Sequence, residues 1–282
     1  MAVNEDSVAG PRSCLPSAAK KKVLLATLLA RANQVVPTGQ LIEEIWGPAK
    51  PRTAKAALQV YVAQLRQELD APGQAGAIRT EEDGYLVQVG AEEFDLYRFE
   101  QLSGFGRNHL HNGRYTEASV VLSAALGLWR GPALHGVVSG PLLGIFATRL
   151  DEMRLAAREM CLESDLHLGR HRDVVSELFT VVAEHPLQEA FCRQLMLALY
   201  RSERQAEALQ AYRRTRDLLN RELGVEPGRA LRRLQQAILT ADRSLDFHPQ
   251  AEPVGRQSRV DPSGWPQMST PTRPITSVRQ SW

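Results

Sequence analysis

The residues best able to do chemistry in this chain are basic side chains gathered in one segment that contains no acid. Between Gly47 and Gln67 the sequence has neither Asp nor Glu, and its four cations are Lys50, Arg52, Lys55 and Arg66. A cluster of ammonium and guanidinium groups binds anions, and the phosphate backbone of nucleic acid is one such anion. A solvated helix face would carry the same charges, so the cluster alone leaves both interpretations open.

The charge of the whole chain conceals this segment. The 282 residues include 34 Lys and Arg against 32 Asp and Glu, which gives a net charge of +2. This near balance argues against a uniformly basic, histone-like binder but not against one basic patch. Because 43% of the residues are hydrophobic and 23% charged, the chain can bury a core, and its length predicts about two domains.

The sequence patterns that mark catalytic and metal sites are missing. The sequence has no Gly-Lys pair for a phosphate-binding loop, no G-x-S-x-G and no H-E-x-x-H. Three distant cysteines (Cys14, Cys161 and Cys192) form no C-x-x-C pair, which argues against disulfides and structural zinc. The acid pair Glu43-Glu44 is interpreted as exposed solubilising charge. We therefore expect no enzyme activity, no metal and no cofactor.

The same observations bear on where the protein is found. Unpaired cysteines favour a reducing, cytoplasmic compartment. The run Val23–Ala30 follows three lysines but is only eight residues long, so we interpret it as part of a buried helix rather than a signal peptide. No apolar run approaches the roughly 20 residues of a membrane span.

Three helices and a hairpin are predicted to position the basic segment. Apolar residues at helical spacing and helix-stopping residues predict helices over Lys20–Ala32, Thr38–Trp46 and Arg52–Leu69. Thr38 is expected to cap the second of these, and Val35-Val36-Pro37 before it is expected to be extended. Asp83-Gly84 lies between two β-prone runs and predicts a hairpin.

The predicted third helix has two unlike sides. One is apolar, with Leu58, Val62, Leu65 and Leu69. The other is small and polar, with Arg52, Thr53, Ala56, Val60, Ala63 and Gln67. The order of three helices and a hairpin is typical of a winged helix-turn-helix, in which the third helix enters the major groove of DNA. An all-helical small domain could begin in the same way, but the hairpin favours the winged fold.

This arrangement assigns roles to individual side chains. Gln59 is expected to read a base edge, preferring adenine, while Val60 or Ala63 contacts a thymine methyl group. The predicted phosphate contacts are Thr53, Lys55 and Arg66, with Arg79 of the hairpin reaching a neighbouring phosphate or the minor groove. Arg52 is also predicted to contact DNA. Lys55 lies toward the apolar side of the helical wheel, so its stem would have to bend outward. The acidic hairpin tip, 81–83, is expected to point away from DNA.

Residues 95–242 are predicted to be helical throughout, with a repeat. Gly169, His171 and Val174 each precede a matching position by 34 residues, and the matches are Glu203, Gln205 and Ala208. A 34-residue period is typical of tetratricopeptide repeats, which are stacked helical hairpins. A plain helical bundle is the alternative.

The predicted fold is therefore mainly α, a winged helix-turn-helix followed by a tetratricopeptide-like all-helical domain. Residues 1–19 are expected to form a loop with a short strand, 20–92 the winged domain, 93–245 the helical domain and 246–282 a disordered, Pro-rich tail.

Several motifs together resemble the Streptomyces antibiotic regulatory protein (SARP) family. They are Lys22–Asn33, Leu41–Gly47, Ala57–Arg66, Asp83–Leu86, Phe94-Asp95, Leu128–Gly131 and Glu222–Pro227. The resemblance implies an OmpR-type winged helix and a bacterial transcriptional activation domain. It further implies a cytoplasmic activator of a secondary-metabolite gene cluster that binds direct repeats in promoter DNA as a homodimer and recruits RNA polymerase. Family members usually have several strands before the first helix, so this sheet is expected to be shortened here.

Two other kinds of protein are considered. One is a helical-repeat adaptor or ligand-sensing regulator that acts through protein contacts, and the other is an enzyme with an unrecognised site. The acid-free basic segment favours DNA binding over both.

Overall fold

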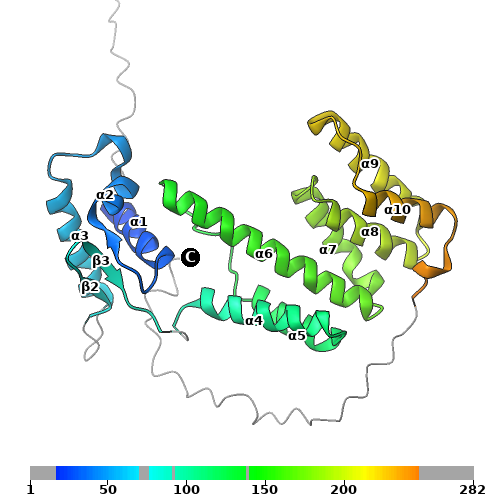
Figure 1. Ribbon diagram of the computed structural model, residues 1–282, viewed down its shortest axis with the longest axis horizontal. Coiled ribbons are helices and arrows are strands. Elements are labelled where there is room, and N and C mark those ends of the chain that lie inside the picture. The colour runs from blue at the N-terminus through cyan, green and yellow to red at the C-terminus, as the bar shows by residue number, and fades with distance from the viewer. Residues whose placement is uncertain (1–16, 70–75, 91–92, 138–139, 248–282) are drawn as a thin grey trace, which may run out of the picture. The chain divides into compact units, whose positions relative to one another are not determined.

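The computed structural model describes residues 17–69, 76–90, 93–137 and 140–247 (Figure 1). Contacts between Cα atoms divide it into two compact units. The described residues before Phe94, together with those in Gly131–Asp151, form the first unit, and those in Phe94–Arg130 and from Glu152 onward form the second. The sequence placed 131–151 in the helical domain, so the grouping of this segment with the first unit differs from the single boundary expected near residue 92.

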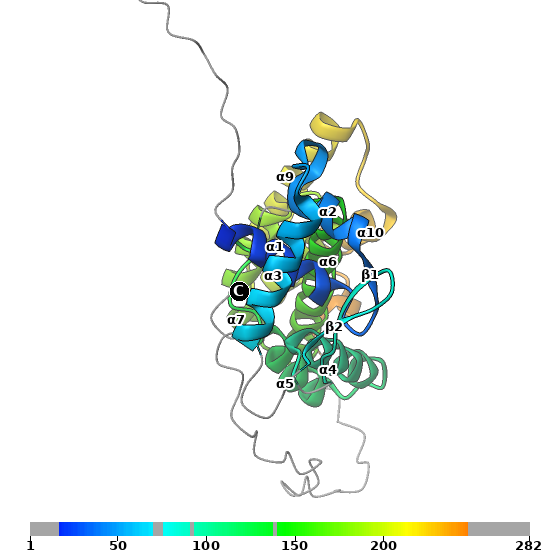
Figure 2. The same ribbon diagram turned by 90° about the vertical axis from the view of Figure 1, so that its left-hand side faces the viewer.

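The first unit contains the expected three helices and hairpin, which Figure 2 shows facing the viewer. The helices are α1 (Ser17–Ala30), α2 (Thr38–Trp46) and α3 (Ala54–Leu69), with a single 3-10 turn, η1 (Gly47–Ala49), after α2. The strands are β1 (Val36–Pro37), β2 (Ile78–Thr80) and β3 (Gly84–Val87). They form an antiparallel sheet in the order β1-β3-β2, in which Arg79 is opposite Leu86.

Several helix ends differ from the sequence expectations. Helix α1 ends at Ala30 rather than Ala32, and α3 begins at Ala54 rather than Arg52. Helix α1 begins at Ser17, so the last residues of the segment expected to be loop are helical, and the strand expected near Cys14 lies outside the described residues. The N-cap of α2 is Pro37 rather than Thr38, and no side chain caps this helix end. Thr38 instead donates its backbone N–H to Asp83 O at 3.0 Å, which holds the hairpin turn against the start of α2.

The core of the first unit comes from the predicted apolar faces. Leu24 and Leu28 of α1, Leu41 of α2 and Leu58 of α3 are fully buried, and Ile78 of the hairpin is almost so. The predicted stripe of α3 is confirmed, since all four of its apolar residues are buried. This stripe fixes which face of α3 is left for solvent.

Two residues tie the small sheet to the helices. A Cβ at Gly84 would lie 2.0 Å from Val36 O, so only glycine lets β1 approach β3 this closely. Asn33 has a left-handed backbone (φ 63°) and continues the pairing beyond β3. Its amide side chain accepts from Val89 N (3.0 Å) and donates to Val89 O (3.1 Å), as a neighbouring strand would.

Within the first unit, the segment Gly131–Asp151 is held by a buried carboxylate. Helix α6 (Pro141–His167) begins in this unit, and its first backbone N–H groups donate to Glu44 of α2. The distances are 2.6 Å from Leu142 N to Oε1 and 3.3 Å from Leu143 N to Oε2. Glu44 is only 7% exposed. The interpretation of Glu44 as an exposed solubilising charge is therefore wrong, because the carboxylate satisfies the orphan donors of a helix N-terminus.

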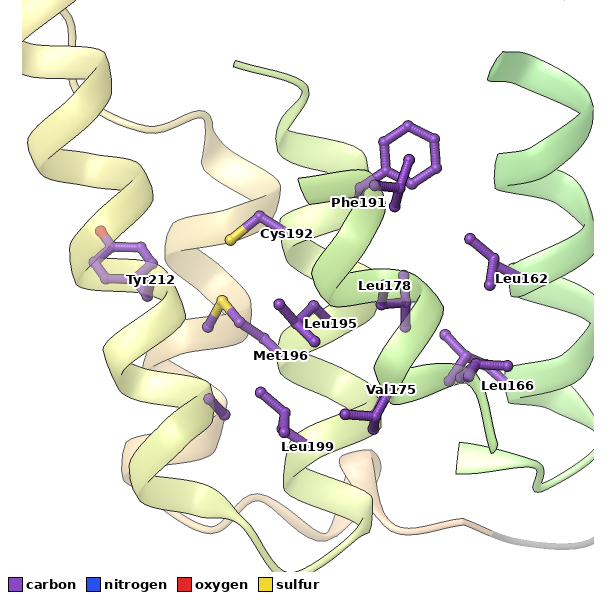
Figure 3. Packing of buried hydrophobic residues seen from close by; sticks show 14 of the residues in the cluster. Leu162, Leu166, Val175, Leu178, Phe191, Cys192, Leu195, Met196, Leu199 and Tyr212 are labelled. Carbon is purple, nitrogen blue, oxygen red and sulfur yellow. The ribbon is translucent and has the colours of Figure 1, made fainter. Parts of the chain in front are cut away.

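The second unit is all-helical. It contains α4 (Asp95–His111), α5 (Tyr115–Leu126), the rest of α6, α7 (His171–Glu184), α8 (Glu189–Arg201), α9 (Gln205–Leu223), α10 (Arg229–Leu239) and the 3-10 turn η2 (Arg243–Leu245). One apolar cluster joins α4, α5 and α6 around Phe99 and Leu122. A larger cluster joins α6 to α10, and Figure 3 shows its centre around Leu178, Leu195 and Met196. None of the described helices has the length and apolar character of a membrane span.

The predicted repeat coincides with helix starts. Helices α7 and α9 begin at His171 and Gln205, which are 34 residues apart. A left-handed residue precedes each helix by two positions: Gly169 (φ 79°) before α7 and Glu203 (φ 64°) before α9. Residues 174 and 208, three positions into each helix, are buried. The repeat is therefore a recurring turn and helix start.

The last described residues pack back on the repeat. Arg201 donates from Nε to Leu245 O at 2.8 Å, and the Phe247 ring lies edge-on to His171 with the centroids 4.9 Å apart. A Cβ at Gly169 would come within 2.8 Å of the same ring. Residues Asp246 and Phe247 of the expected tail are thus ordered on the helices, and the remainder of that tail lies outside the described residues.

Candidate nucleic-acid interface

The exposed side of α3 carries the side chains that the sequence predicted for DNA contact. Gln59, Val60 and Ala63 are exposed along the helix, and Val60 keeps 52% of its surface in solvent. Arg52 and Thr53 are exposed in the turn before Ala54, the first helical residue. The exposed valine, with a glutamine and an alanine near it, gives an uncharged surface of mostly short side chains. Such a surface allows base edges in a DNA groove to come close to the helix.

Lys55 is exposed, and the burial at this end of the helix falls on Ala54. Its ammonium group can therefore reach solvent from the first turn of α3, and the phosphate contact assigned to it stays a prediction.

The only acid within α3 is held against another helix. Glu68 pairs with Lys21 of α1, with 2.5 Å between Nζ and Oε1. The Glu68 carboxylate is therefore held against α1. The cations near the start of α3 therefore have no acid from their own helix beside them.

Aromatic packing fixes the angle between α2 and α3. The rings of Trp46 and Tyr61 stack with centroids 6.0 Å apart and planes 19° from parallel. Lys20 of α1 lies over the Trp46 ring at 5.5 Å. The pairing of Tyr61 with Trp46 was not foreseen from the sequence because it joins two helices.

The hairpin carries one exposed cation, Arg79, and accepts hydrogen bonds from another, Arg66 of α3. Arg79 on β2 is exposed, as predicted for a residue that reaches DNA. Arg66 is half-buried, and its guanidinium group donates to Ile78 O (2.9 Å from Nε) and to Thr80 Oγ1 (2.7 Å from Nη2). The structure thus commits two of the Arg66 donors to the hairpin, and the assignment of this side chain to a phosphate stays a prediction.

The acidic tip of the hairpin is exposed at Glu81, Glu82 and Asp83. Its turn closes with a hydrogen bond from Glu81 N to Gly84 O at 3.0 Å. Since carboxylates repel phosphate, we expect any DNA contact of the hairpin to come from Arg79 rather than from the tip.

The titratable groups with the largest pKa changes belong to the second unit. Burial raises the pKa of the Cys192 thiol to about 11, and burial with Arg201 nearby lowers the pKa of His171 to about 4. Both side chains belong to the helical core of the second unit. In the described part of the chain, no three His, Cys, Asp or Glu side chains are grouped to hold a metal ion.

Comparison with protein families matches both parts of the chain. Residues 14–87 match the family described as "Transcriptional regulatory protein, C terminal", and residues 94–239 match "Bacterial transcriptional activator domain". The first match contains the exposed side of α3 and the hairpin, and the second contains the helical repeat.

Individual relatives extend over both parts. The chain is 39% identical to the regulatory protein DnrI of Streptomyces peucetius over 83% of this chain and 89% of that protein. It is 43% identical to the regulatory protein AfsR of Streptomyces coelicolor over 80% of this chain, but this covers only 22% of that longer protein. Among solved structures, Mycobacterium tuberculosis EmbR in complex with a low-affinity phosphopeptide has a TM-score of 0.75 and 35% identity. That match covers 80% of this chain and 61% of EmbR.

Proposed function

This chain belongs to the SARP family of DNA-binding transcriptional regulators, which are not enzymes, and we propose that it activates a secondary-metabolite gene cluster by binding direct repeats in the promoter. The observation that carries the proposal is the exposed side of α3. Its short, uncharged side chains allow DNA to approach closely, and cations surround them. The acid of this helix, Glu68, is paired with Lys21.

Base recognition is proposed to come from the middle of α3. The Gln59 amide has one donor and one acceptor, which match N7 and N6 of adenine in the major groove. Val60 and Ala63 lie one and four positions further, so both border the same exposed strip and can contact a thymine methyl group.

Phosphate contacts are proposed to surround this strip. Arg52 and Thr53 precede the helix, and Lys55 lies in its first turn, so all three reach one end of the groove. Arg79 lies exposed on β2, the strand that Arg66 contacts near the other end of α3, and it reaches a phosphate or the minor groove. These contacts position the protein without selecting a sequence.

The helical second unit is proposed to contact RNA polymerase while two protomers occupy adjacent repeats. The support is the match of 94–239 to the activator domain and the likeness over most of its length to DnrI, which is itself named a regulatory protein. The compartment proposed for this activity is the cytoplasm, where promoter DNA and polymerase are found.

The test uses the full chain and a variant of the base-reading residue. Duplexes are first selected from a random library on the wild-type protein, and the selected sequence is then titrated by fluorescence polarisation against random competitor. We expect Gln59→Ala to lose about 1–3 kcal/mol on the selected duplex and little on random DNA. The matched control is Gln101→Ala, an exposed glutamine on α4, which should bind as the wild type does.

Two results would contradict the proposal. Equal loss by Gln59→Ala on selected and random DNA would remove Gln59 from base recognition. Failure of the wild-type chain to enrich any sequence would favour the alternative of an adaptor that acts through protein contacts.

A further inference from the structure

Arg66 lies in the last turns of α3, where that helix passes the hairpin. Of the predicted cations, it is the one whose side chain crosses from α3 to β2 within the described residues. Of the residues 70–77 that join these two elements, 70–75 lie outside the described residues. The two hydrogen bonds of Arg66 therefore form a direct side-chain link between helix and hairpin.

The carbonyl that Arg66 contacts faces away from the sheet. Gln88 N donates to Ala77 O at 2.8 Å, and Glu81 N donates to Gly84 O at 3.0 Å, so residues 77 and 81 face β3. Backbone groups alternate along an antiparallel strand, and those of residue 78 therefore point to the free edge of β2. In the described sheet β2 has only β3 as a neighbour. The Arg66 guanidinium thus supplies the partner that a further strand would have supplied.

The second acceptor makes the contact specific for arginine. Nε binds the Ile78 carbonyl while Nη2 binds the Thr80 hydroxyl, two residues further along the strand. A planar guanidinium presents donors in a fixed fork, whereas lysine carries a single ammonium on a flexible stem. Lysine at this position would keep the charge but lose this pair of hydrogen bonds, to the Ile78 carbonyl and the Thr80 hydroxyl.

We propose that Arg66 is a positioning residue that holds the hairpin at a fixed place beside α3, so that Arg79 and Gln59 meet the same DNA molecule together. This inference rests on the proposed DNA-binding function. In this proposal Arg66 affects DNA binding indirectly, through the position of the hairpin, and not through a phosphate contact of its own. Thr80 is the acceptor partner through which the effect is tested, because its side chain can be changed without altering the charge.

The first arm of the test measures DNA affinity with Arg66→Lys, Thr80→Val and the double variant of the full chain. We expect each single change to weaken binding to the selected duplex by about 3- to 10-fold, and the double variant to be no weaker than Arg66→Lys. Arg107→Lys, at an exposed arginine on α4, is the matched control for the substitution and should bind normally. Wild-type affinity in either Arg66→Lys or Thr80→Val overturns the proposal, because a phosphate contact would tolerate both.

The first arm also includes Arg79→Ala, which separates positioning from general stabilisation. If Arg66 presents Arg79 to DNA, the loss caused by Arg79→Ala is smaller in the Arg66→Lys background than in the wild type. A role in fold stability alone would leave the two losses equal. Equal losses in both backgrounds therefore overturn the proposal.

The second arm does not depend on DNA. Hydrogen–deuterium exchange of peptides that cover 76–88 should be faster in Arg66→Lys and Thr80→Val, while peptides from α1 exchange as in the wild type. Unchanged exchange in 76–88 overturns the link between helix and hairpin. If the wild-type chain selects no duplex, the proposed function fails, and this arm by itself decides whether Arg66 holds the hairpin.

Discussion

Removal of the Glu44 carboxylate should destabilise the first unit more than removal of the carboxylate of its exposed neighbour, Glu43. Glu44 accepts the N–H groups of Leu142 and Leu143 at the start of α6, and Leu143 is fully buried. In Glu44→Ala the amide of Leu143 cannot be reached by water, and a buried donor without an acceptor costs about 1–3 kcal/mol. Leu142 is half-buried, so water can replace part of the hydrogen bond that its N–H loses.

The lost interaction between charge and helix dipole adds to this cost. A carboxylate at a helix N-terminus contributes about 0.3–1 kcal/mol, and more where the site is partly buried. The expected destabilisation by Glu44→Ala is therefore about 2–4 kcal/mol. Glu44→Gln keeps one acceptor oxygen but brings an NH2 group toward the helix donors, so we expect about 1–2 kcal/mol for it.

The assay has to report on the first unit alone, because the chain contains two units. Pulsed hydrogen exchange at increasing urea, read on peptides from α1 to α3, gives the unfolding midpoint of this unit. The matched control is Glu43→Ala, one position earlier on α2 and exposed, which should stay within about 0.5 kcal/mol of the wild type. Equal costs for Glu43→Ala and Glu44→Ala would refute the reasoning, since burial and helix capping would then have no measurable effect.

Three further predictions concern other parts of the chain. Lys55→Ala should reduce the slope of log affinity against log salt by about one, measured on the selected duplex, whereas Lys22→Ala on α1 should leave the slope unchanged. Asn33→Ala should cost about 1–2 kcal/mol in urea unfolding, because it removes both hydrogen bonds to Val89 and places alanine at a positive φ; no loss would contradict this. The pKa of His171 lies at about 4 in the folded state, below its ordinary value of 6.5, so its neutral form is favoured by folding. Stability is then complete above pH 6.5 and falls by up to about 3 kcal/mol toward pH 4, so the melting temperature of the wild type should fall relative to that of His171→Leu over that range.

Periodicity in the sequence was enough to predict the faces of α3. The spacing of Leu58, Val62 and Leu65 determines which side is buried, so the exposed side with Gln59 followed directly. The Asp83-Gly84 pair predicted the hairpin because this dipeptide is a typical turn signal. The structure gives Gly84 a further role, since β1 approaches β3 closely at this residue. The 34-residue offset likewise predicted the starts of α7 and α9.

Contacts between distant residues were beyond such patterns. Glu44 and Leu142 are 98 residues apart in the chain, and nothing local distinguishes Glu44 from the exposed Glu43. Arg66 was assigned to phosphate by its charge alone, and only the fold brings it to Ile78 and Thr80. Helix wheels describe one helix at a time, and they cannot reveal which carboxylate or guanidinium meets another element.

The packing of Phe247 on Gly169 places two separate constraints on one position. The positive φ of Gly169 disfavours most side chains, and the Phe247 ring would have to shift to admit a Cβ. Among homologous chains, those that retain an aromatic residue at the position of Phe247 should therefore retain glycine at the position of Gly169. Where the aromatic residue has been lost, asparagine becomes acceptable, because it tolerates the left-handed backbone. The two positions, 78 residues apart, are thus expected to vary together during evolution.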